Sequence, residues 1–440
     1  MTALLITCRR GSVLPRNVAR HLLVAPRFQS TLMVEEEYFA TDHKKPIFVA
    51  ATKQHVGKTS TSLALMSGLQ KRFDKVGFMK PVGQVCLPVW EEDIKQEIQV
   101  DKDVVVMKQH FGLDPLPYRY MSPVLIPKGY TRNYLDGNIR EDIHEELIRQ
   151  AYDKISRATD VVLMEGTGHA AVGSIVGASN ARVASWIGAE MVLVANGGLG
   201  STFDELDLNK NLCDQHNVPI AGVIINKVIP DKLEQTRHYI GKALDTNWGV
   251  PLLGVVPDRP FLGCPALKDL ERLFGCKLLS GKDKSLRHYT VRDLNLVATS
   301  LSVFLENLRI KPTRTLYVCH VSREDIILGF LAEYQRRKCR NEPFEAALIA
   351  CGRTDRFSLD PQVLDMIEQT KKAPPIMRSP YTCREAMEMI HNYTPKLNMA
   401  DSDRVSTTVN HYEPYIDFDL LLERTGNTPS DNNVKSAAAM

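Results

Sequence analysis

Residues 50–60 read Ala-Ala-Thr-Lys-Gln-His-Val-Gly-Lys-Thr-Ser and end in the Gly-Lys-Thr of a phosphate-binding loop, or P-loop. In this motif glycine lets backbone N–H groups approach a phosphate, lysine supplies a cation, and the threonine hydroxyl suits Mg²⁺. The apolar run 46–50 precedes the loop as a buried strand would, and 61–73 places apolar residues at helical spacing. The N-terminus of such a helix also attracts anions. Strand, loop and helix together predict a bound nucleotide.

Further apolar runs follow the loop, separated by segments long enough for helices. These runs are 76–79, 161–164, 191–195, 222–225 and 252–256. Uninterrupted apolar strands are typical of a parallel sheet that is covered on both faces. The covering helices are expected at 143–158, 178–188, 204–216 and 232–245. The sequence therefore predicts an α/β domain over 46–280, built on a doubly wound, mostly parallel sheet.

A smaller α/β domain is predicted over 313–424. Its strands are expected at 315–319 and 346–350, and its helices at 324–337, 361–369 and 383–393. Residues 281–312, with one helix near 291–308, are expected to connect the two domains. The end of the chain, 425–440, is rich in Asn, Ser, Thr and Ala and is expected to be disordered.

Length and composition set the general class of the protein. The chain has 440 residues, of which 44% are hydrophobic, enough for two or three domains with cores of their own. No apolar run reaches the roughly 18 residues of a membrane span. The nine cysteines form no C-x-x-C pair and show no zinc-ligand spacing, which is typical of reduced thiols inside a cell compartment.

The first 30 residues differ from the rest, since they carry five arginines and no acidic residue. This composition is typical of an organellar presequence, and Arg27-Phe28-Gln29-Ser30-Thr31 is similar to a mitochondrial processing site. A basic tail without a targeting role is the alternative. Taking these five from the 55 Lys and Arg leaves 50 against 52 Asp and Glu, so nucleic acid is not an expected partner. We expect a protein of the mitochondrial matrix.

Polar or glycine-rich turns follow the predicted strands. They begin at Lys80, Glu165, Asn196, Asn226 and Pro257. Ligands of parallel α/β sheets bind outside the carboxyl ends of the strands. We therefore expect the whole edge of the sheet to contribute to one site.

Two carboxylates are candidates for the metal. Glu165 is expected beside the phosphates, where its carboxylate and the Thr59 hydroxyl would ligate Mg²⁺; the alternative is an acid that caps the following turn. Asp103, in the string 101–106, is a candidate second carboxylate, and its alternative role is a helix N-cap.

Three further side chains are candidates for chemistry or recognition. Lys80 is suited to stabilising charge during phosphoryl transfer or to holding an anionic substrate, although a surface lysine would look the same. Asn226 offers donors and an acceptor to a purine edge, or forms a turn. His169 is a weaker candidate, because an unpaired histidine is usually structural.

The ordered motifs at 52–59, 80–82, 165–168 and 226 resemble those of the dethiobiotin synthetase and cobyrinic acid diamide synthase group of P-loop proteins. The strings at 166–170, 179–184 and 197–201 look most like the synthetase-like domain at the front of long phosphotransacetylases and their stand-alone relatives. In those proteins a DRTGG domain follows, and 351–356 is the nearest string here. The resemblance covers about 46–424, and the acetyltransferase domain is expected to be missing.

The resemblance implies ATP and Mg²⁺ as cofactors. The residues implied to bind the nucleotide are Val56, Gly57, Lys58, Thr59, Ser60, Asn226 and Pro257. The implied metal ligands are Thr59, Asp103 and Glu165, and the implied catalytic groups are Lys58 and Lys80. Lys53 and His55 stand where the dethiobiotin enzymes have acidic residues, which argues against their diaminononanoate substrate.

Three functions are compatible with this pattern, and the sequence leaves open whether the protein is an enzyme. The first is a mitochondrial ATP- and Mg²⁺-binding protein that acts as a regulatory or scaffolding module with its DRTGG-like domain. The second is an ATP-dependent ligase that activates a small carboxylate or carbamate, which adds a small acidic substrate as partner. The third is a pseudo-enzyme subunit of a larger mitochondrial assembly. A homo-oligomer or a subunit of a larger complex is expected.

Overall fold

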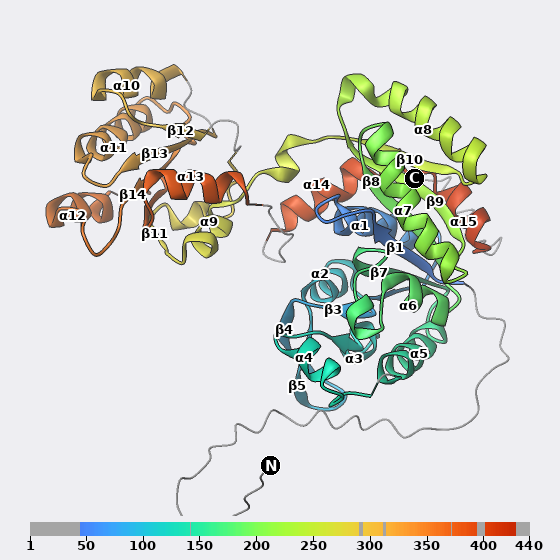
Figure 1. Cartoon of the computed structure of the whole chain (residues 1–440). Helices are drawn as coiled ribbons and strands as arrows, with labels where there is room; N and C mark the ends of the chain where they lie inside the picture. Colours follow the sequence, from blue (N-terminus) through green and yellow to red (C-terminus); the bar gives the residue numbers. More distant parts are fainter. Residues whose placement is uncertain are drawn as a thin grey trace, which may run out of the picture. The chain divides into compact units, whose positions relative to one another are not determined.

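The computed structural model describes residues 45–140, 142–289, 294–310, 314–370, 372–393 and 401–427 (Figure 1). The expected presequence, 1–30, lies outside this range. So does most of the expected disordered tail, of which 425–427 alone are described. These three close the last helix, where the buried Asn427 Nδ2 donates to the Lys45 carbonyl oxygen at 2.9 Å.

A six-stranded sheet forms the centre of the first domain, with the strand order β10-β9-β8-β1-β7-β2 and parallel pairing throughout. Its strands are β1 (Ile47–Ala51), β2 (Val76–Met79), β7 (Val161–His169), β8 (Glu190–Asn196), β9 (Ile220–Val228) and β10 (Leu252–Pro257). Its helices are α1 (Lys58–Gln70), α5 (Ile143–Ser156), α6 (Asn180–Trp186), α7 (Gly200–Gln215) and α8 (Leu233–Trp248). The predicted parallel α/β fold is confirmed, because each apolar run is a strand buried among helices.

A segment between β2 and β7 adds elements that the apolar runs did not predict. It contains β3 (Val82–Gly83), β4 (Cys86–Glu91), β5 (Gln96–Asp101), α2 (Lys102–Phe111), α3 (Tyr118–Met121), β6 (Val124–Leu125) and α4 (Tyr130–Leu135). The antiparallel hairpin β4–β5 is largely exposed, although residues 86–90 of β4 are all apolar, so an apolar run alone does not mark a buried strand. Its end matters for function, because Asp101 closes β5 and caps α2.

A five-stranded sheet forms the second domain, with the order β11-β15-β14-β13-β12 and only β11 antiparallel to its neighbour. Its strands are β11 (Leu278–Ser280), β12 (Leu294–Leu296), β13 (Leu316–His320), β14 (Ala347–Cys351) and β15 (Ile376–Ser379). Its helices are α9 (Leu267–Phe274), α10 (Leu301–Ile310), α11 (Glu324–Cys339), α12 (Pro361–Gln369) and α13 (Cys383–His391). The predicted second α/β unit is thus present.

The cores place the domain boundaries elsewhere than the sequence analysis did. Residues of α9, β11 and β13 share one hydrophobic cluster, and α10 packs in another with α11. The expected connection 281–312 therefore contributes a strand and a helix to the second domain, which begins near Leu267. Its strands β11 and β12 are only three residues long, too short to stand out as apolar runs.

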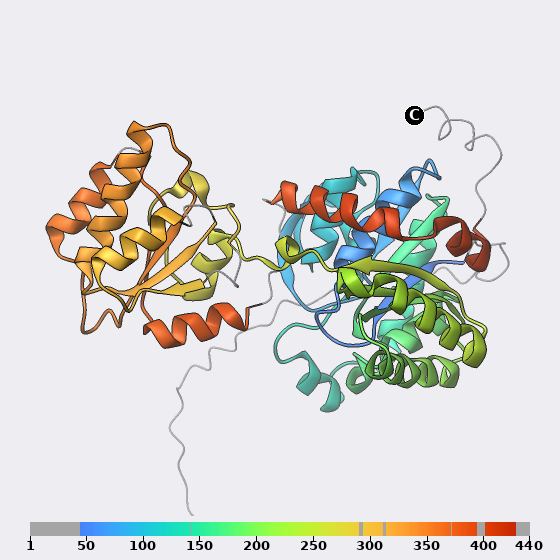
Figure 2. The same cartoon turned by 90° about the horizontal axis from the view of Figure 1, so that it is seen from above.

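The last helices return to the first domain instead of completing the second. They are α14 (Ser402–Tyr412), the short 3₁₀ helix η6 (Glu413–Tyr415) and α15 (Phe418–Thr425). Their apolar side chains belong to the core of the six-stranded sheet, and α14 lies along α1 (Figures 1 and 2). Gly68 of α1 makes room for Phe418, because a Cβ on Gly68 would lie 2.1 Å from the phenyl ring. The second domain is thus inserted between β10 and α14, which corrects the expected boundary at 424.

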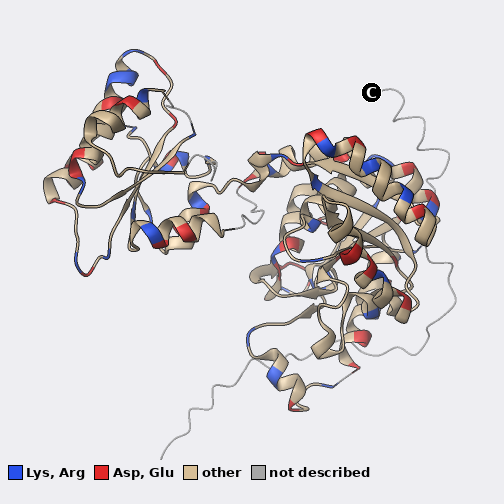
Figure 3. Cartoon of the chain, turned by 45° about the horizontal axis from the view of Figure 1, so that its top comes forward, with Lys and Arg blue, Asp and Glu red and all other residues tan. Residues whose placement is uncertain are grey.

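Charged side chains of both signs are interspersed along the helices of both domains (Figure 3). Many are paired locally, as in the Arg149–Glu145 and Lys210–Asp214 bridges, each spanning one helical turn. Within the described ranges, no helix combines the length and the apolar character that a bilayer crossing requires.

Candidate nucleotide site at the P-loop

Gly57 sets the geometry of the P-loop. Its φ of 94° lies in the left-handed region that favours glycine, and it is the N-cap of α1. A Cβ at this position would lie 2.3 Å from the Asn226 Nδ2 atom. Gly57 therefore allows both the turn into α1 and the close approach of β9. Lys58, Thr59 and Ser60 follow in the first turn of the helix, as the motif requires.

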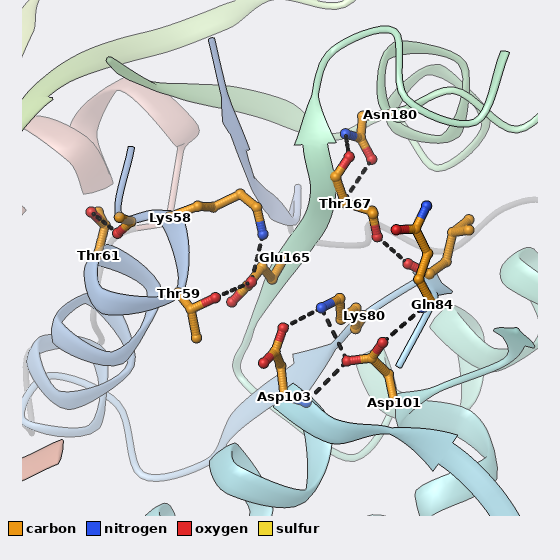
Figure 4. Close-up of polar contacts among 12 residues, drawn as sticks. Lys58, Thr59, Thr61, Lys80, Gln84, Asp101, Asp103, Glu165, Thr167 and Asn180 are labelled. Carbon is orange, nitrogen blue, oxygen red and sulfur yellow. Dashed lines mark hydrogen bonds and ion pairs between the residues drawn. The ribbon is translucent and has the colours of Figure 1, made fainter. Parts of the chain in front are cut away.

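Glu165 joins the P-loop lysine and threonine (Figure 4). Its Oε1 atom accepts from Lys58 Nζ at 2.5 Å and from Thr59 Oγ1 at 2.8 Å. β7 continues to His169, so Glu165 lies within the strand, paired with Val49 of β1, rather than at the predicted strand end. Its side chain is fully buried, and among the described residues Oε2 has no hydrogen-bond partner.

Lys80 forms a second buried cluster with two aspartates (Figure 4). Its Nζ atom lies 3.0 Å from Asp101 Oδ1 and also contacts Asp103 Oδ2. Asp101 also accepts from the backbone N–H groups of Gln84, Val85 and Asp103. Asp101, and not Asp103, is the N-cap of α2, which excludes the N-cap alternative for Asp103. The sequence analysis quoted Asp101 but did not select it as a site residue.

The pKa values of the two lysines shift in opposite directions. Burial lowers the pKa of Lys58 despite the neighbouring Glu165 carboxylate. Burial would also lower the pKa of Lys80, but the carboxylates of Asp103, Glu165 and Asp101 outweigh it and raise the pKa. For Asp103, burial opposes the charged form, and the Lys80 and Lys58 ammonium groups lower its pKa below the ordinary value. Lys80 and Asp103 therefore remain charged at neutral pH.

Asn226 holds the P-loop from β9. Its Nδ2 group donates to the Val56 carbonyl oxygen at 2.7 Å and to Tyr412 Oη at 2.9 Å, while its Oδ1 accepts from the Lys227 N–H. The side chain is 1% exposed, and both Nδ2 protons have protein partners. The structure thus places Asn226 against the loop, and its contact with a purine stays a prediction.

A cavity of about 640 Å³ lies over the P-loop. Most of the predicted site residues line it: Val56, Gly57, Lys58, Thr59, Ser60, Lys80, Asp103 and Pro257. The sequence analysis missed other lining residues, among them Asp101, Lys227, Arg259 and Tyr412. No local motif signals Tyr412, which reaches the loop from a helix beyond the second domain. His169 does not line the cavity; its backbone oxygen accepts from Asn180 Nδ2 at 2.7 Å in the turn after β7.

The two residues that depart from the dethiobiotin pattern have protein contacts of their own. Lys53 Nζ pairs with Glu205 Oε1 at 2.6 Å, and the His55 carbonyl oxygen accepts from Lys227 Nζ at 2.6 Å. His55 itself has a φ of 63°, which is uncommon for a residue with a side chain. This part of the loop is therefore fixed by contacts with α7 and β9.

The donor set suits a divalent cation bound together with phosphate. Within the described ranges, no three side chains of His, Cys, Asp or Glu gather to hold a metal ion by themselves. Mg²⁺ does not need such a cage, since it is usually held by one or two carboxylates, water and substrate phosphates. Glu165 fits that mode, because its Oε1 contacts the Thr59 hydroxyl and its Oε2 has no hydrogen-bond partner among the described residues.

Comparison with known proteins agrees with this geometry. The AAA_26 family model, described as an AAA domain, matches residues 45–266, half of the chain. A phosphate acetyltransferase of Nitrosomonas europaea is 24% identical over 391 residues, which cover 86% of this chain and 51% of that protein. The chain thus spans about half the length of the phosphate acetyltransferases that it matches.

Two further relatives match over about half of this chain. The ATP-dependent dethiobiotin synthetase BioD of Nitrosospira multiformis is 26% identical over 213 residues, or 48% of this chain and 88% of that protein. A cobyric acid synthase of Clostridium botulinum is 26% identical over 235 residues, or 50% of this chain and 46% of that protein. These matches confirm the predicted resemblance to synthetase-like P-loop proteins. The chain belongs to the AAA domain family of P-loop proteins.

Proposed function

We propose that this chain is a mitochondrial ATP- and Mg²⁺-binding protein, in which the nucleotide site regulates or scaffolds together with a DRTGG-like second domain. The observation that carries the nucleotide proposal is the buried contact of Lys58 and Thr59 with Glu165, one oxygen of which has no partner among the described residues. Bringing a P-loop lysine and threonine onto one buried carboxylate prepares the loop for a metal and a phosphate chain.

The charges of the two buried clusters favour this ligand. Asp101, Asp103 and Glu165 bring three carboxylates, and Lys58 and Lys80 bring two ammonium groups. Asp103 is 20% exposed and borders the cavity, whose lining also carries Lys53, Lys102, Lys227 and Arg259. These cations attract the negative charge of a phosphate chain, and the carboxylates are suited to a divalent cation bound with it.

The residues divide into three roles in this proposal. Gly57, Lys58 and Ser60 hold the phosphates; Thr59, Glu165 and Asp103 hold Mg²⁺, which neutralises phosphate charge when bound. Pro257, which borders the cavity, is assigned to the base, and Asn226 holds the loop at the Val56 carbonyl oxygen. Lys80 holds Asp103 in place through their ion pair. No further step is required of a module that binds and releases nucleotide.

A regulatory role is favoured over catalysis by the loop itself. Lys53 and His55 replace the acidic residues of the dethiobiotin enzymes, and Lys53 is engaged with Glu205. The mitochondrial part of the proposal rests on the arginine-rich first 30 residues. Import of the labelled full chain into isolated mitochondria tests it, and a chain that stays outside and protease-sensitive contradicts it.

Isothermal titration of the full chain with ATP and MgCl₂ tests nucleotide binding. We expect saturable binding that weakens at least tenfold when EDTA replaces MgCl₂. Lys58→Ala is expected to abolish binding, while Lys242→Ala, at an exposed position of α8, leaves it unchanged. Absence of binding by the unmodified chain, or equal binding by Lys58→Ala, would overturn the proposal.

An ATP-dependent ligase is the second candidate, and one observation favours it. The 640 Å³ cavity extends past the P-loop to Lys80, Gln84 and Thr167, which leaves room for a second small molecule beside the phosphates. In this function Lys58 and Lys80 would stabilise charge in the transfer of the terminal phosphoryl group to a carboxylate or carbamate. Release of ADP and phosphate that depends on an added small acid supports this candidate, and ATP turnover indifferent to a panel of such acids opposes it.

A further inference from the structure

Tyr412 is the last residue of α14, which follows the second domain in the chain, and it reaches the P-loop through Asn226. Its Oη atom accepts from Asn226 Nδ2 at 2.9 Å, and that same amide donates to the Val56 carbonyl oxygen at 2.7 Å. A Cβ at Gly57 would lie 3.3 Å from Tyr412 Oη. We propose that Tyr412 is a positioning residue that holds the P-loop ready for phosphate, and this inference rests on the proposed nucleotide-binding function.

The hydroxyl group is the part of Tyr412 that acts on the loop. Asn226 is 1% exposed and Tyr412 is 4% exposed, so their hydrogen bond is shielded from water. Burial raises the pKa of Tyr412, which keeps the phenol protonated at neutral pH. Without the hydroxyl, the Asn226 amide would keep the Val56 carbonyl oxygen and the Lys227 N–H as partners but lose one of the three hydrogen bonds that orient it. A buried polar network of this kind is sensitive to the loss of one member.

Tyr412 needs a rigid support to act in this way, and α14 provides it. Ser67 Oγ of α1 donates to Glu413 Oε2 at 2.9 Å, just past Tyr412. His411 Nε2 lies 2.8 Å from the Pro257 carbonyl oxygen, at the end of β10. The helix is thus attached to α1 and to β10 on either side of the loop. This arrangement fixes the tyrosine relative to Gly57.

The start of α14 is tied to the chain that forms the second domain. Arg404, 2% exposed, pairs with Asp401 Oδ2 at 3.2 Å and with Asp269 Oδ2 of α9 at 3.7 Å. His288 Nε2 lies 2.7 Å from Asp401 Oδ2. The helix that carries Tyr412 therefore begins among residues of the inserted segment.

The expected size of the effect follows from the loss of one hydrogen bond. If the loop adopts its phosphate-binding conformation for a smaller fraction of the time, its affinity for phosphate falls in proportion to that fraction. For one neutral hydrogen bond this corresponds to about a 3- to 10-fold rise in Kd. Because Tyr412 acts through the loop, the same factor is expected for any ligand that uses the loop, with or without a base.

Two variants test whether Tyr412 acts on the loop: Tyr412→Phe, and Tyr415→Phe in the neighbouring η6 as the matched control. We would titrate each full chain with ATP and with inorganic tripolyphosphate, both with MgCl₂, and expect Tyr412→Phe alone to weaken both by the same factor. Weakening of ATP binding alone would assign Tyr412 to the base and overturn the inference. Unchanged binding of both ligands would overturn it as well.

Hydrogen exchange of the ligand-free chains keeps the inference testable whatever the unmodified protein binds. We expect the amides of 55–60 to exchange about 3- to 10-fold faster in Tyr412→Phe, with those of α8 unchanged as a control for folding. Equal exchange in the loop would refute the positioning role. If the unmodified chain bound neither ligand, the proposed function would fall while faster exchange still supported the role of Tyr412.

Discussion

Replacing Glu165 by glutamine tests the reasoning on which the nucleotide site depends. The change keeps the size of a fully buried side chain and removes its charge. Oε1 of Glu165 accepts one charge-assisted hydrogen bond from Lys58 and one neutral bond from Thr59. The first is worth about 1.5–3 kcal/mol and the second about 0.5–1.5 kcal/mol. Since glutamine retains an acceptor for Thr59, we expect the free energy of unfolding to fall by about 1.5–3 kcal/mol at pH 7.

Tryptophan fluorescence gives the assay domain specificity, because all three tryptophans, Trp90, Trp186 and Trp248, lie in the first domain. Urea unfolding in EDTA measures the ligand-free change. Glu234→Gln is the matched control, since Glu234 is 84% exposed and its partner is 3.8 Å away. Stability of Glu165→Gln within about 0.5 kcal/mol of the unmodified chain would refute the view that this carboxylate compensates Lys58.

The same variant separates metal binding from phosphate binding. We expect Mg²⁺ to enhance ATP binding less in Glu165→Gln, since the neutral amide is a poorer ligand for a hard cation. Loss of a residue that only supports a metal ligand typically costs about 10- to 100-fold in metal affinity, and we expect the loss of a ligand to cost at least as much. Binding of ATP in EDTA should not weaken, because the variant no longer offers a carboxylate that competes for Lys58. An undiminished Mg²⁺ dependence would place the metal elsewhere.

Two other predictions use the same fluorescence assay. The Lys80 ammonium group lowers the pKa of Asp103, so the Asp103 charge stabilises the fold above the ordinary carboxyl pKa of about 4, and this contribution is lost as pH falls through the folded-state pKa. Asp103→Asn should therefore have a lower free energy of unfolding than the unmodified chain at pH 7, and the difference should shrink toward pH 3. A difference that does not change with pH would contradict this. Gly68→Ala should lower the free energy of unfolding by about 1–3 kcal/mol, because its Cβ would lie 2.1 Å from the Phe418 ring. Gly263→Ala, whose Cβ would have nothing within 4 Å, should lower it far less. Equal losses of stability would show that α15 does not pack closely on α1.

Much of the first domain could be predicted because its signals are local. β1, β2 and β7 to β10 are uninterrupted apolar runs, and such runs have few alternatives to buried parallel strands. Lys58 and Thr59 stand at fixed positions in a contiguous motif. Glu165 was selected because it follows four apolar residues, although the strand continues past it to His169.

Other parts of the site could not be predicted, because their partners are far apart in the chain. Asp101 and Asp103 looked like two acids in a loop, and their pairing with Lys80 depends on the exposed hairpin β4–β5, which the sequence analysis did not predict. The pKa values of Lys58 and Lys80 also shift in opposite directions, because burial lowers both and only at Lys80 do the surrounding carboxylates outweigh it.

The sequence by itself determined that residues 46–60 form strand, P-loop and helix start, since a short contiguous motif contains every group that the turn requires. Only the tertiary structure decided how the loop is held. In the sequence, the whole second domain lies between Gly57 and Tyr412. The amphipathic spacing of α14 also does not indicate which of the two sheets this helix will cover. The choice follows from packing: Gly68 leaves a space that Phe418 fills, and this contact docks the returning helices on α1 beside the P-loop.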